Sequence, residues 1–229
     1  MPCIHKFHAH PEHLTDNQGL LPKWKANTLI IGTFNPEHDW HPTNMANYFY
    51  GRRRNYLWKI LPRFAGLDSI AHADVDAQIV FLDNHKIALT DLLIRINDAD
   101  LDNEEHVRRI RTVLDDELER FTNFEWNTPH IQTYLAANDI QTVYFTKLGK
   151  PLAGLVDDDT FEGQMRKIEL TCLELGIPSY RLHTPSGNGL GTGRPKHHNL
   201  IRRWYTQNGA DNFPFLSQDF DVENFPVDI

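Results

Sequence analysis

Two polar turns contain residue types that could carry out hydrolytic chemistry. The first, Gly32-Thr33-Phe34-Asn35-Pro36, follows an apolar run at 28–31, and the second, His183-Thr184-Pro185-Ser186-Gly187, follows a similar run at 179–182. A carboxamide oxygen can hold a water molecule, and an imidazole can transfer a proton near neutral pH. An asparagine that bonds to its own backbone is the structural alternative for the first turn. Ligands of an open parallel sheet bind at the carboxyl ends of its strands, so turns about 150 positions apart could meet in one cleft.

An aromatic segment followed by three arginines lies between the two turns. Asn47-Tyr48-Phe49-Tyr50-Gly51 could offer a flat face to a nucleobase, and Arg52-Arg53-Arg54 could bind phosphates. An aromatic cluster at the edge of the core and a solvated basic face explain the same residues equally well. The segment is therefore a candidate nucleic-acid contact with a structural alternative.

The second turn continues into a loop with a glycine at every second position from 187 to 193. Such a loop lets the backbone approach a ligand closely, and the free N–H groups of the helix that follows at Pro195 favour an anion. Leu190 stands alone in this polar loop and could act as a wedge between bases. A flexible surface loop is the alternative.

Short apolar segments and helical patterns alternate along the chain. Four segments are predicted to be strands buried on both faces, at 28–33, 86–91, 141–147 and 179–182. The predicted helices are Leu57–Phe64 with a kink at Pro62, a stripe from Val107 to Phe121 capped by Asp102 or Asn103, a helix starting near Pro129, Phe161–Leu175 ending at Gly176, and 195–207 closed by Gly209. This alternation predicts an α/β fold in which helices cover both sides of a parallel sheet.

Every predicted strand ends in polar side chains that apolar packing does not require. Thr33 and Asn35 follow the first strand, Thr90-Asp91 ends the second, Thr146-Lys147 ends the third, and 183–186 follows the fourth. Their convergence at one edge of the sheet predicts an active cleft.

Composition favours one soluble domain. The chain has 229 residues, of which 40% are hydrophobic and 24% charged, and we expect a single domain over 1–229 with an irregular segment at 1–26 and an acidic tail at 210–229. Two cysteines, no apolar leader and no long apolar run favour a cytoplasmic protein without membrane contact. The spacings of Cys3 and the nearby histidines match no standard zinc site, so we expect no metal and no cofactor. A net charge of −8 argues weakly against nucleic acid, although the basic residues are clustered.

Taken in order, these motifs resemble the uracil-DNA glycosylase superfamily. Phe34-Asn35-Pro36 looks like the first motif of its mismatch-specific branch. Residues 49–61 are similar to the hypoxanthine-DNA glycosylase branch, with an aromatic pair, a glycine, an asparagine and an aromatic–tryptophan step into an apolar helix. Residues 87–93 look like the second strand of that branch, and 183–187 resembles the C-terminal loop of the superfamily.

The resemblance implies a three-layer α/β/α sandwich with a central four-stranded parallel sheet. It also implies a monomeric, monofunctional enzyme that hydrolyses the N-glycosidic bond of uracil or hypoxanthine flipped from DNA. By position, Asn35 would orient the water, although Glu37 or Asp39 could take it instead. Phe49 would stack on the extruded base, and His183 would donate a hydrogen bond to the departing base.

Together with the basic clusters, the resemblance predicts three groups of site residues. The predicted catalytic residues are Asn35, His183 and Asn55, and the predicted base-binding residues are Thr33, Phe34, Phe49, Tyr50, Thr90 and Asp91. The predicted DNA-binding residues are Arg52, Arg53, Arg54, Lys147, Ser186, Gly187, Asn188, Gly189, Leu190, Arg194 and Lys196.

The chain departs from the superfamily pattern at two positions and in one loop. Glu37 replaces the usual glycine after the first motif, Thr90-Asp91 stands where a pyrimidine-reading asparagine is usual, and the C-terminal loop is longer and richer in glycine. Two other functions remain open. The cleft could bind a nucleotide or modified nucleoside without cutting it, or it could hydrolyse small N-ribosides.

Overall fold

A four-stranded parallel sheet forms the centre of the computed structural model, which describes residues 1–8, 20–149, 157–186, 188, 190 and 195–223. Its strands are β2 (Thr28–Gly32), β3 (Ile87–Asp91), β6 (Thr142–Phe145) and β7 (Ser179–Arg181), in the spatial order β3-β2-β6-β7. Each matches a predicted strand with slightly shorter bounds, and all three pairings are parallel. The prediction of an α/β fold around a four-stranded parallel sheet is therefore confirmed.

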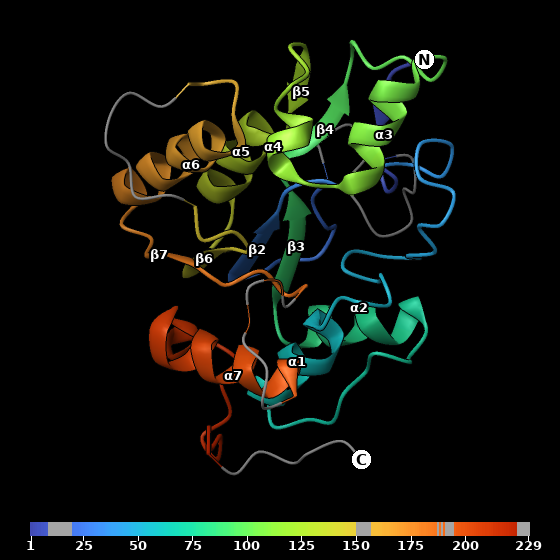
Figure 1. Cartoon of the computed structure of the whole chain (residues 1–229). Coiled ribbons are helices and arrows are strands. Elements are labelled where there is room, and N and C mark those ends of the chain that lie inside the picture. Colours follow the sequence, from blue (N-terminus) through green and yellow to red (C-terminus); the bar gives the residue numbers. More distant parts are fainter. Residues whose placement is uncertain (9–19, 150–156, 187, 189, 191–194, 224–229) are drawn as a thin grey trace.

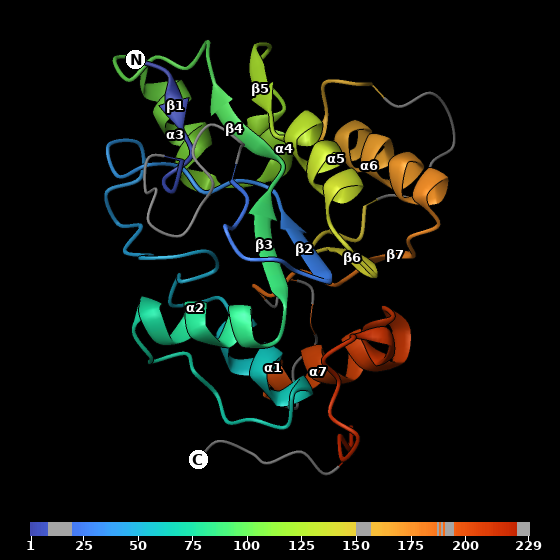
Figure 2. The same ribbon diagram turned by 180° about the vertical axis from the view of Figure 1, so that it is seen from behind.

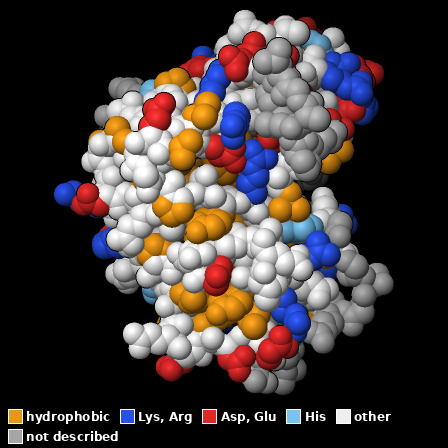
Figure 3. Space-filling model, turned by 90° about the vertical axis from the view of Figure 1, so that its left-hand side faces the viewer, with side chains coloured by type: hydrophobic (Ala, Val, Ile, Leu, Met, Phe, Trp, Pro, Cys, Tyr) orange, Lys and Arg blue, Asp and Glu red, His pale blue; other side chains and the backbone are white. Residues whose placement is uncertain are grey.

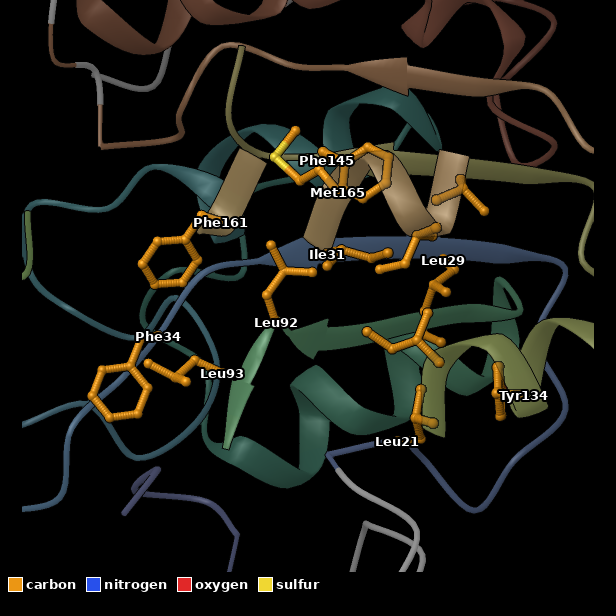
Figure 4. Packing of buried hydrophobic residues seen from close by; sticks show 14 of the residues in the cluster. Leu21, Leu29, Ile31, Phe34, Leu92, Leu93, Tyr134, Phe145, Phe161 and Met165 are labelled. Atoms are coloured by element: carbon orange, nitrogen blue, oxygen red, sulfur yellow. The ribbon is translucent and has the colours of Figure 1, made fainter. Parts of the chain in front are cut away.

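Helices cover both faces of this sheet, because successive side chains of a strand point to opposite sides. From β2, Leu29 and Ile31 join one buried cluster with α5 (Thr128–Ala137) and α6 (Phe161–Leu175). Figure 4 shows Ile31 beside Met165 and Phe161 of α6. On the opposite side, Ile30 packs with α1 (Leu57–Phe64), α2 (Val75–Asn84) and α7 (Lys196–Gln207). The two views of the ribbon show these helix groups on either side of the sheet (Figures 1 and 2).

Helix boundaries follow the capping residues. The side chain of Thr160 accepts a hydrogen bond from Gly163 N at the start of α6, and Gly176 ends that helix in the left-handed region at φ 71°. Pro129 lies in the first turn of α5, and Pro62 lies inside α1. The predictions for these helices are confirmed, whereas the sequence pattern gave no expectation for α2.

The predicted stripe from Val107 to Phe121 does not form one helix, so that prediction is wrong. The structure has α3 (Glu104–Thr112), capped by Asn103, and a short α4 (Asp115–Leu118), with Val113 left-handed between them at φ 53°. The Thr112 hydroxyl donates to Arg109 O at 2.7 Å and accepts from Leu114 N at 3.2 Å. These side-chain bonds replace the next helical hydrogen bonds and end α3.

A second, antiparallel sheet extends from β3 and was not predicted. It contains β1 (Cys3–Ile4), β4 (Leu93–Ile96) and β5 (Phe124–Trp126), with β4 in the centre. Within the segment 1–26, which was expected to be irregular, Cys3–Ile4 forms β1 and pairs with β4.

The segment predicted to be an acidic tail packs onto the fold in its described part. A 3-10 helix, η1 (Ala210–Asn212), is followed by Phe213 and Phe220, whose rings contact Phe64 of α1. In the part of the chain that the structure describes, no helix combines the length and the apolar character needed to cross a membrane.

Candidate active site

A cleft opens at the carboxyl edge of the parallel sheet, between β2 and β6. The chain leaves β2 towards β3 on one side and leaves β6 towards β7 on the other, so the strand order reverses at this point. The cleft has a volume of about 1320 Å³, and both Asn35 and His183 line it. The backbone N–H of Tyr56 donates to Pro185 O at 2.8 Å, which joins the aromatic segment to the second turn.

The side chain of Asn35 is held from two directions. Its Oδ1 atom accepts a hydrogen bond from Asn44 Nδ2 at 2.6 Å and another from Arg52 Nη2 at 3.0 Å. Asn35 is 7% exposed, and Lys6 N donates to its backbone carbonyl at 2.8 Å. Both lone pairs of Oδ1 are therefore occupied, so this oxygen is not placed to hold a water molecule.

A buried histidine and a carboxylate form a pair at the floor of the cleft. His5 Nε2 lies 2.8 Å from Asp91 Oδ2, and His5 is 1% exposed. The rings of Phe7, Phe34 and Phe49 surround the imidazole, with centroids at 5.6–5.7 Å. Asp91 itself lines the cleft.

Tyr50 is the aromatic residue that the predicted segment presents to the cleft. Its hydroxyl lies 3.0 Å from Thr146 Oγ1, and Thr146 Oγ1 also lies 3.4 Å from Ile31 O. Burial, together with the negative charge of Asp91, raises the pKa of Tyr50 well above its ordinary value. Tyr50 thus remains a phenol, in a backbone conformation (φ 57°) that few non-glycine residues adopt.

His183 is fixed at the opposite wall through its backbone and one ring nitrogen. Trp204 Nε1 donates to His183 O at 2.7 Å, and His183 Nδ1 lies 3.3 Å from Thr184 O. A carbonyl only accepts, so this contact places a proton on Nδ1, and the neutral ring then has Nε2 as an acceptor. Burial lowers the pKa of His183, with a further contribution from the charge of Arg203. Donation from Nε2 therefore needs an acidic solution.

Cationic and polar side chains form the rim of the cleft. Among the predicted DNA-binding residues, those that line it are Arg52, Arg53, Arg54, Lys147, Ser186, Asn188 and Lys196. Arg53, Arg54 and Lys196 are exposed, whereas Arg52 is half-buried. Lys147 forms an ion pair with Asp115, which reduces the charge that it offers to a phosphate. Asn55 also lines the cleft, and its Oδ1 accepts from Leu57 N at 2.9 Å at the start of α1.

Four predicted contact residues lie in the hydrophobic interior. Phe49 is 1% exposed between His5 and Phe7, Phe34 packs beside Leu93 (Figure 4), and the buried Thr90 hydroxyl accepts from Asn127. Leu190 packs in the cluster that contains α1 and α7. These side chains are buried by the packing of the core, so Phe49 is not exposed for stacking and Leu190 does not project as a wedge. Gly187, Gly189 and Arg194 lie outside the described residues.

Two carboxylates suggested as partners for the water lie elsewhere. Glu37 Oε1 accepts from Ile4 N at 3.3 Å, and Asp39 borders a second hollow next to α3. Neither is among the described residues that line the cleft. Thr33 does line it, as expected for a residue at a strand exit.

Several cleft residues were missed by sequence reasoning. The segments 41–46 and 111–115 both contribute to the walls, and three exposed apolar side chains, Met45, Leu114 and Leu148, stand along it. Periodicity assigned 111–115 to the interior of a helix, and nothing in the pattern of 41–46 indicated a contact.

Comparisons with family models, with curated proteins and with solved structures gave no match.

Proposed function

We propose that this cleft hydrolyses the N-glycosidic bond of a deaminated or mispaired base, uracil or hypoxanthine, flipped from DNA. The accompanying fold is a three-layer α/β/α sandwich like that of the uracil-DNA glycosylase superfamily. The observation that supports this proposal most directly is the shared cleft. Asn35 and His183, from turns at either end of the domain, line one opening whose rim contains Arg53, Arg54 and Lys196.

The dimensions and lining of the cleft suit an extruded nucleotide. Its volume of about 1320 Å³ exceeds that of a typical small-molecule pocket and leaves room for flanking phosphates. Tyr50 supplies an aromatic side chain inside it, in place of the buried Phe49. Flipping costs a few kcal/mol, and stacking on an aromatic ring offsets about 1–3 kcal/mol of this.

His183 is the candidate donor to the departing base. A preorganised donor to developing negative charge contributes roughly 3 kcal/mol. Because Nδ1 bonds to Thr184 O, the ring donates from Nε2 only when it is protonated. Its lowered pKa therefore predicts that donation strengthens as the pH falls below about 6.5.

The proposal is tested with duplexes that carry uracil, hypoxanthine, xanthine or a thymine mispair, scored for alkali-labile abasic sites. We expect excision from at least one duplex. His183→Ala should lower the single-turnover rate by at least about tenfold because the departing base loses its donor, and Asn35→Ala should do the same because Asn44 and Arg52 lose the oxygen that holds them at the cleft. Unchanged rates in both variants would remove both residues from the mechanism. No excision from any duplex would contradict the proposed reaction.

A second candidate is a protein that binds a nucleotide without cleaving it. The observation in its favour is the occupied Oδ1 atom of Asn35, which is the group that the resemblance assigns to the water. Salt dependence separates the two functions. Duplex binding that weakens steeply between 50 and 200 mM salt, as expected for about six or more phosphate contacts, favours the glycosylase. Binding of mononucleotides that is insensitive to salt favours the alternative.

A further inference from the structure

Hydrolysis in this cleft needs a group that accepts a proton from water, and the geometry narrows the choice. Asn35 Oδ1 is occupied by two donors, and Glu37 and Asp39 lie outside the cleft. Among the described residues that line the cleft, the carboxylates are those of Asp91 and Asp115. Asp115 is neutralised by Lys147 on the wall formed by 111–115. Asp91 is the last residue of β3, at the carboxyl edge of the sheet where ligands of such folds bind.

One carboxylate oxygen of Asp91 is held while the other is available. Oδ2 contacts His5 Nε2 at 2.8 Å, and among the described residues Oδ1 accepts no hydrogen bond. Gly32 is opposite Asp91 in the β2–β3 ladder. A Cβ atom on Gly32 would overlap Asp91 Oδ1 and lie 2.6 Å from Tyr50 Oη. The absence of a side chain at 32 therefore makes space for Oδ1 at the floor of the cleft.

The N-terminal segment fixes the tautomer of His5. Phe7 N donates to His5 Nδ1 at 3.2 Å, so Nδ1 has no proton and Nε2 is the donor to Asp91. The segment is held by Lys6 N to Asn35 O at 2.8 Å and by His5 N to Ile94 O at 2.8 Å. Donation from Nε2 of the imidazole orients the carboxylate, as a buried carboxylate orients a histidine in hydrolases.

We propose that Asp91 is the general base of the cleft and that His5 is its positioning residue; this inference rests on the proposed glycosylase function. Water attacks C1′ of the flipped nucleotide and loses a proton to Asp91 Oδ1. The C1′–N bond breaks, and its electron pair leaves with the base. The base anion then takes up one proton, and Asp91 returns its proton to solvent, so the products are the abasic sugar and the neutral base.

The experiment compares Asp91→Asn with wild type on the duplex that wild type excises best. We expect the single-turnover rate to fall by at least about 100-fold, because a positioned base contributes roughly 10²–10⁴-fold. Affinity for the duplex, measured by fluorescence anisotropy, should change by less than about threefold, since the carboxamide has the same shape. Asp83→Asn is the matched control, because Asp83 lies in the last turn of α2 and forms an exposed ion pair with Lys86; it should leave both quantities unchanged.

The role of His5 is tested by substitution and rescue. His5→Phe removes the hydrogen bond that orients the Asp91 carboxylate, so the single-turnover rate should fall by about tenfold while duplex affinity stays within about threefold of wild type. His5→Gln keeps an N–H donor at the same reach and should restore the rate. Thermal melting of both variants shows whether the fold is retained.

Two outcomes would overturn this inference. Asp91→Asn within about threefold of the wild-type rate would show that the carboxylate is not the base. Single-turnover rates that coincide in wild type, His5→Phe and His5→Gln would show that His5 does not position it. If the proposed function is wrong, wild type excises no base from any duplex. If only this inference is wrong, wild type still excises, and the Asp91 and His5 variants excise at nearly the same rate.

Discussion

Arg52 connects the first turn to the rim of the cleft. Its Nη2 atom donates to Asn35 Oδ1 at 3.0 Å, and burial lowers its pKa while the charge of Asp91 opposes that shift. The guanidinium is therefore close to two of the residues on which the proposed chemistry depends. Arg53 follows in sequence but is exposed, so neighbouring arginines have different surroundings.

This difference predicts separable effects of Arg52→Ala and Arg53→Ala. Loss of Arg53 should weaken duplex binding and reduce the salt slope by about one, because it removes one phosphate contact. Loss of Arg52 should also lower the single-turnover rate by at least about tenfold, since Asn35 loses a charged donor worth roughly 1.5–3 kcal/mol. The measurements are anisotropy at several salt concentrations and excision at saturating protein. Equal excision rates in the two variants would contradict the assignment.

From residue types we could predict where the cleft lies, but we could not predict which side chains face it. The polar strand exits correctly indicated Thr33, Asn35, Asp91 and Thr146. Adjacent residues in an irregular segment point in different directions, so Tyr50 reaches the cleft while Phe49 enters the core. Sequence order does not determine that choice.

The contact between His5 and Asp91 could not be predicted from sequence for a related reason. The two residues are 86 positions apart, and their meeting depends on the short pairing of β1 with β4. A histidine-rich start gave only a weak suggestion of metal binding. One signal could have indicated the pair. Asp91 ends a buried strand, and a carboxylate in that position needs a polar partner when its charge is enclosed.

At the level of elements, the main sheet was predictable because its four strands are apolar runs between turn residues. The second sheet was not. Its strands have only two to four residues, and those of β5 are half-buried, so neither length nor alternation distinguishes them from loops. The break at Val113 was missed because the apolar period continues through it, while the hydrogen bonds of Thr112 end the helix.

The β2–β3 ladder leads to a prediction for Gly32. In Gly32→Ala the new Cβ would displace Asp91 Oδ1 and the Tyr50 hydroxyl, so we expect excision to fall by at least about tenfold. Gly176→Ala is the matched control, because Gly176 has φ 71° and nothing within 4 Å of an added Cβ. It should cost about 1–2 kcal/mol of stability through the left-handed backbone and leave excision unchanged. The measurements are the excision rates and the thermal midpoints of both variants. A fully active Gly32→Ala would show that the space beside Asp91 Oδ1 is not needed for excision.

At the scale of the whole molecule, acidic side chains outnumber basic ones, 31 against 23. On the face in Figure 3, basic and acidic side chains are interspersed, in line with the net charge of −8. The cleft rim, with Arg53, Arg54 and Lys196 exposed, is therefore the favoured place for an anionic ligand. If the proposed function is right, the phosphate contacts that set the salt slope gather around this one opening.

Burial of histidines makes the stability of the whole fold depend on pH. Desolvation lowers the pKa of His8, His41 and His183 below the ordinary value of 6.5. As the pH falls through 6.5, the unfolded chain takes up protons that the folded protein does not, so the free energy of unfolding decreases. The stabilisation is complete above pH 6.5 and is lost as the pH falls through the lowered values. Glu119, whose pKa burial raises, opposes this trend at the acid end of the range.

We therefore expect the thermal midpoint to fall between pH 7.5 and pH 5, by roughly 2–4 °C for each kcal/mol lost. Calorimetric melts at several pH values measure this directly. A triple variant, His8→Gln with His41→Gln and His183→Gln, lacks the three titrating groups and should show a flatter profile over the same range. Equal slopes for wild type and the triple variant would mean that other groups control the acid response. A midpoint that rises on acidification would reverse the sign derived from burial, because protons would then bind the folded protein more tightly than the unfolded chain.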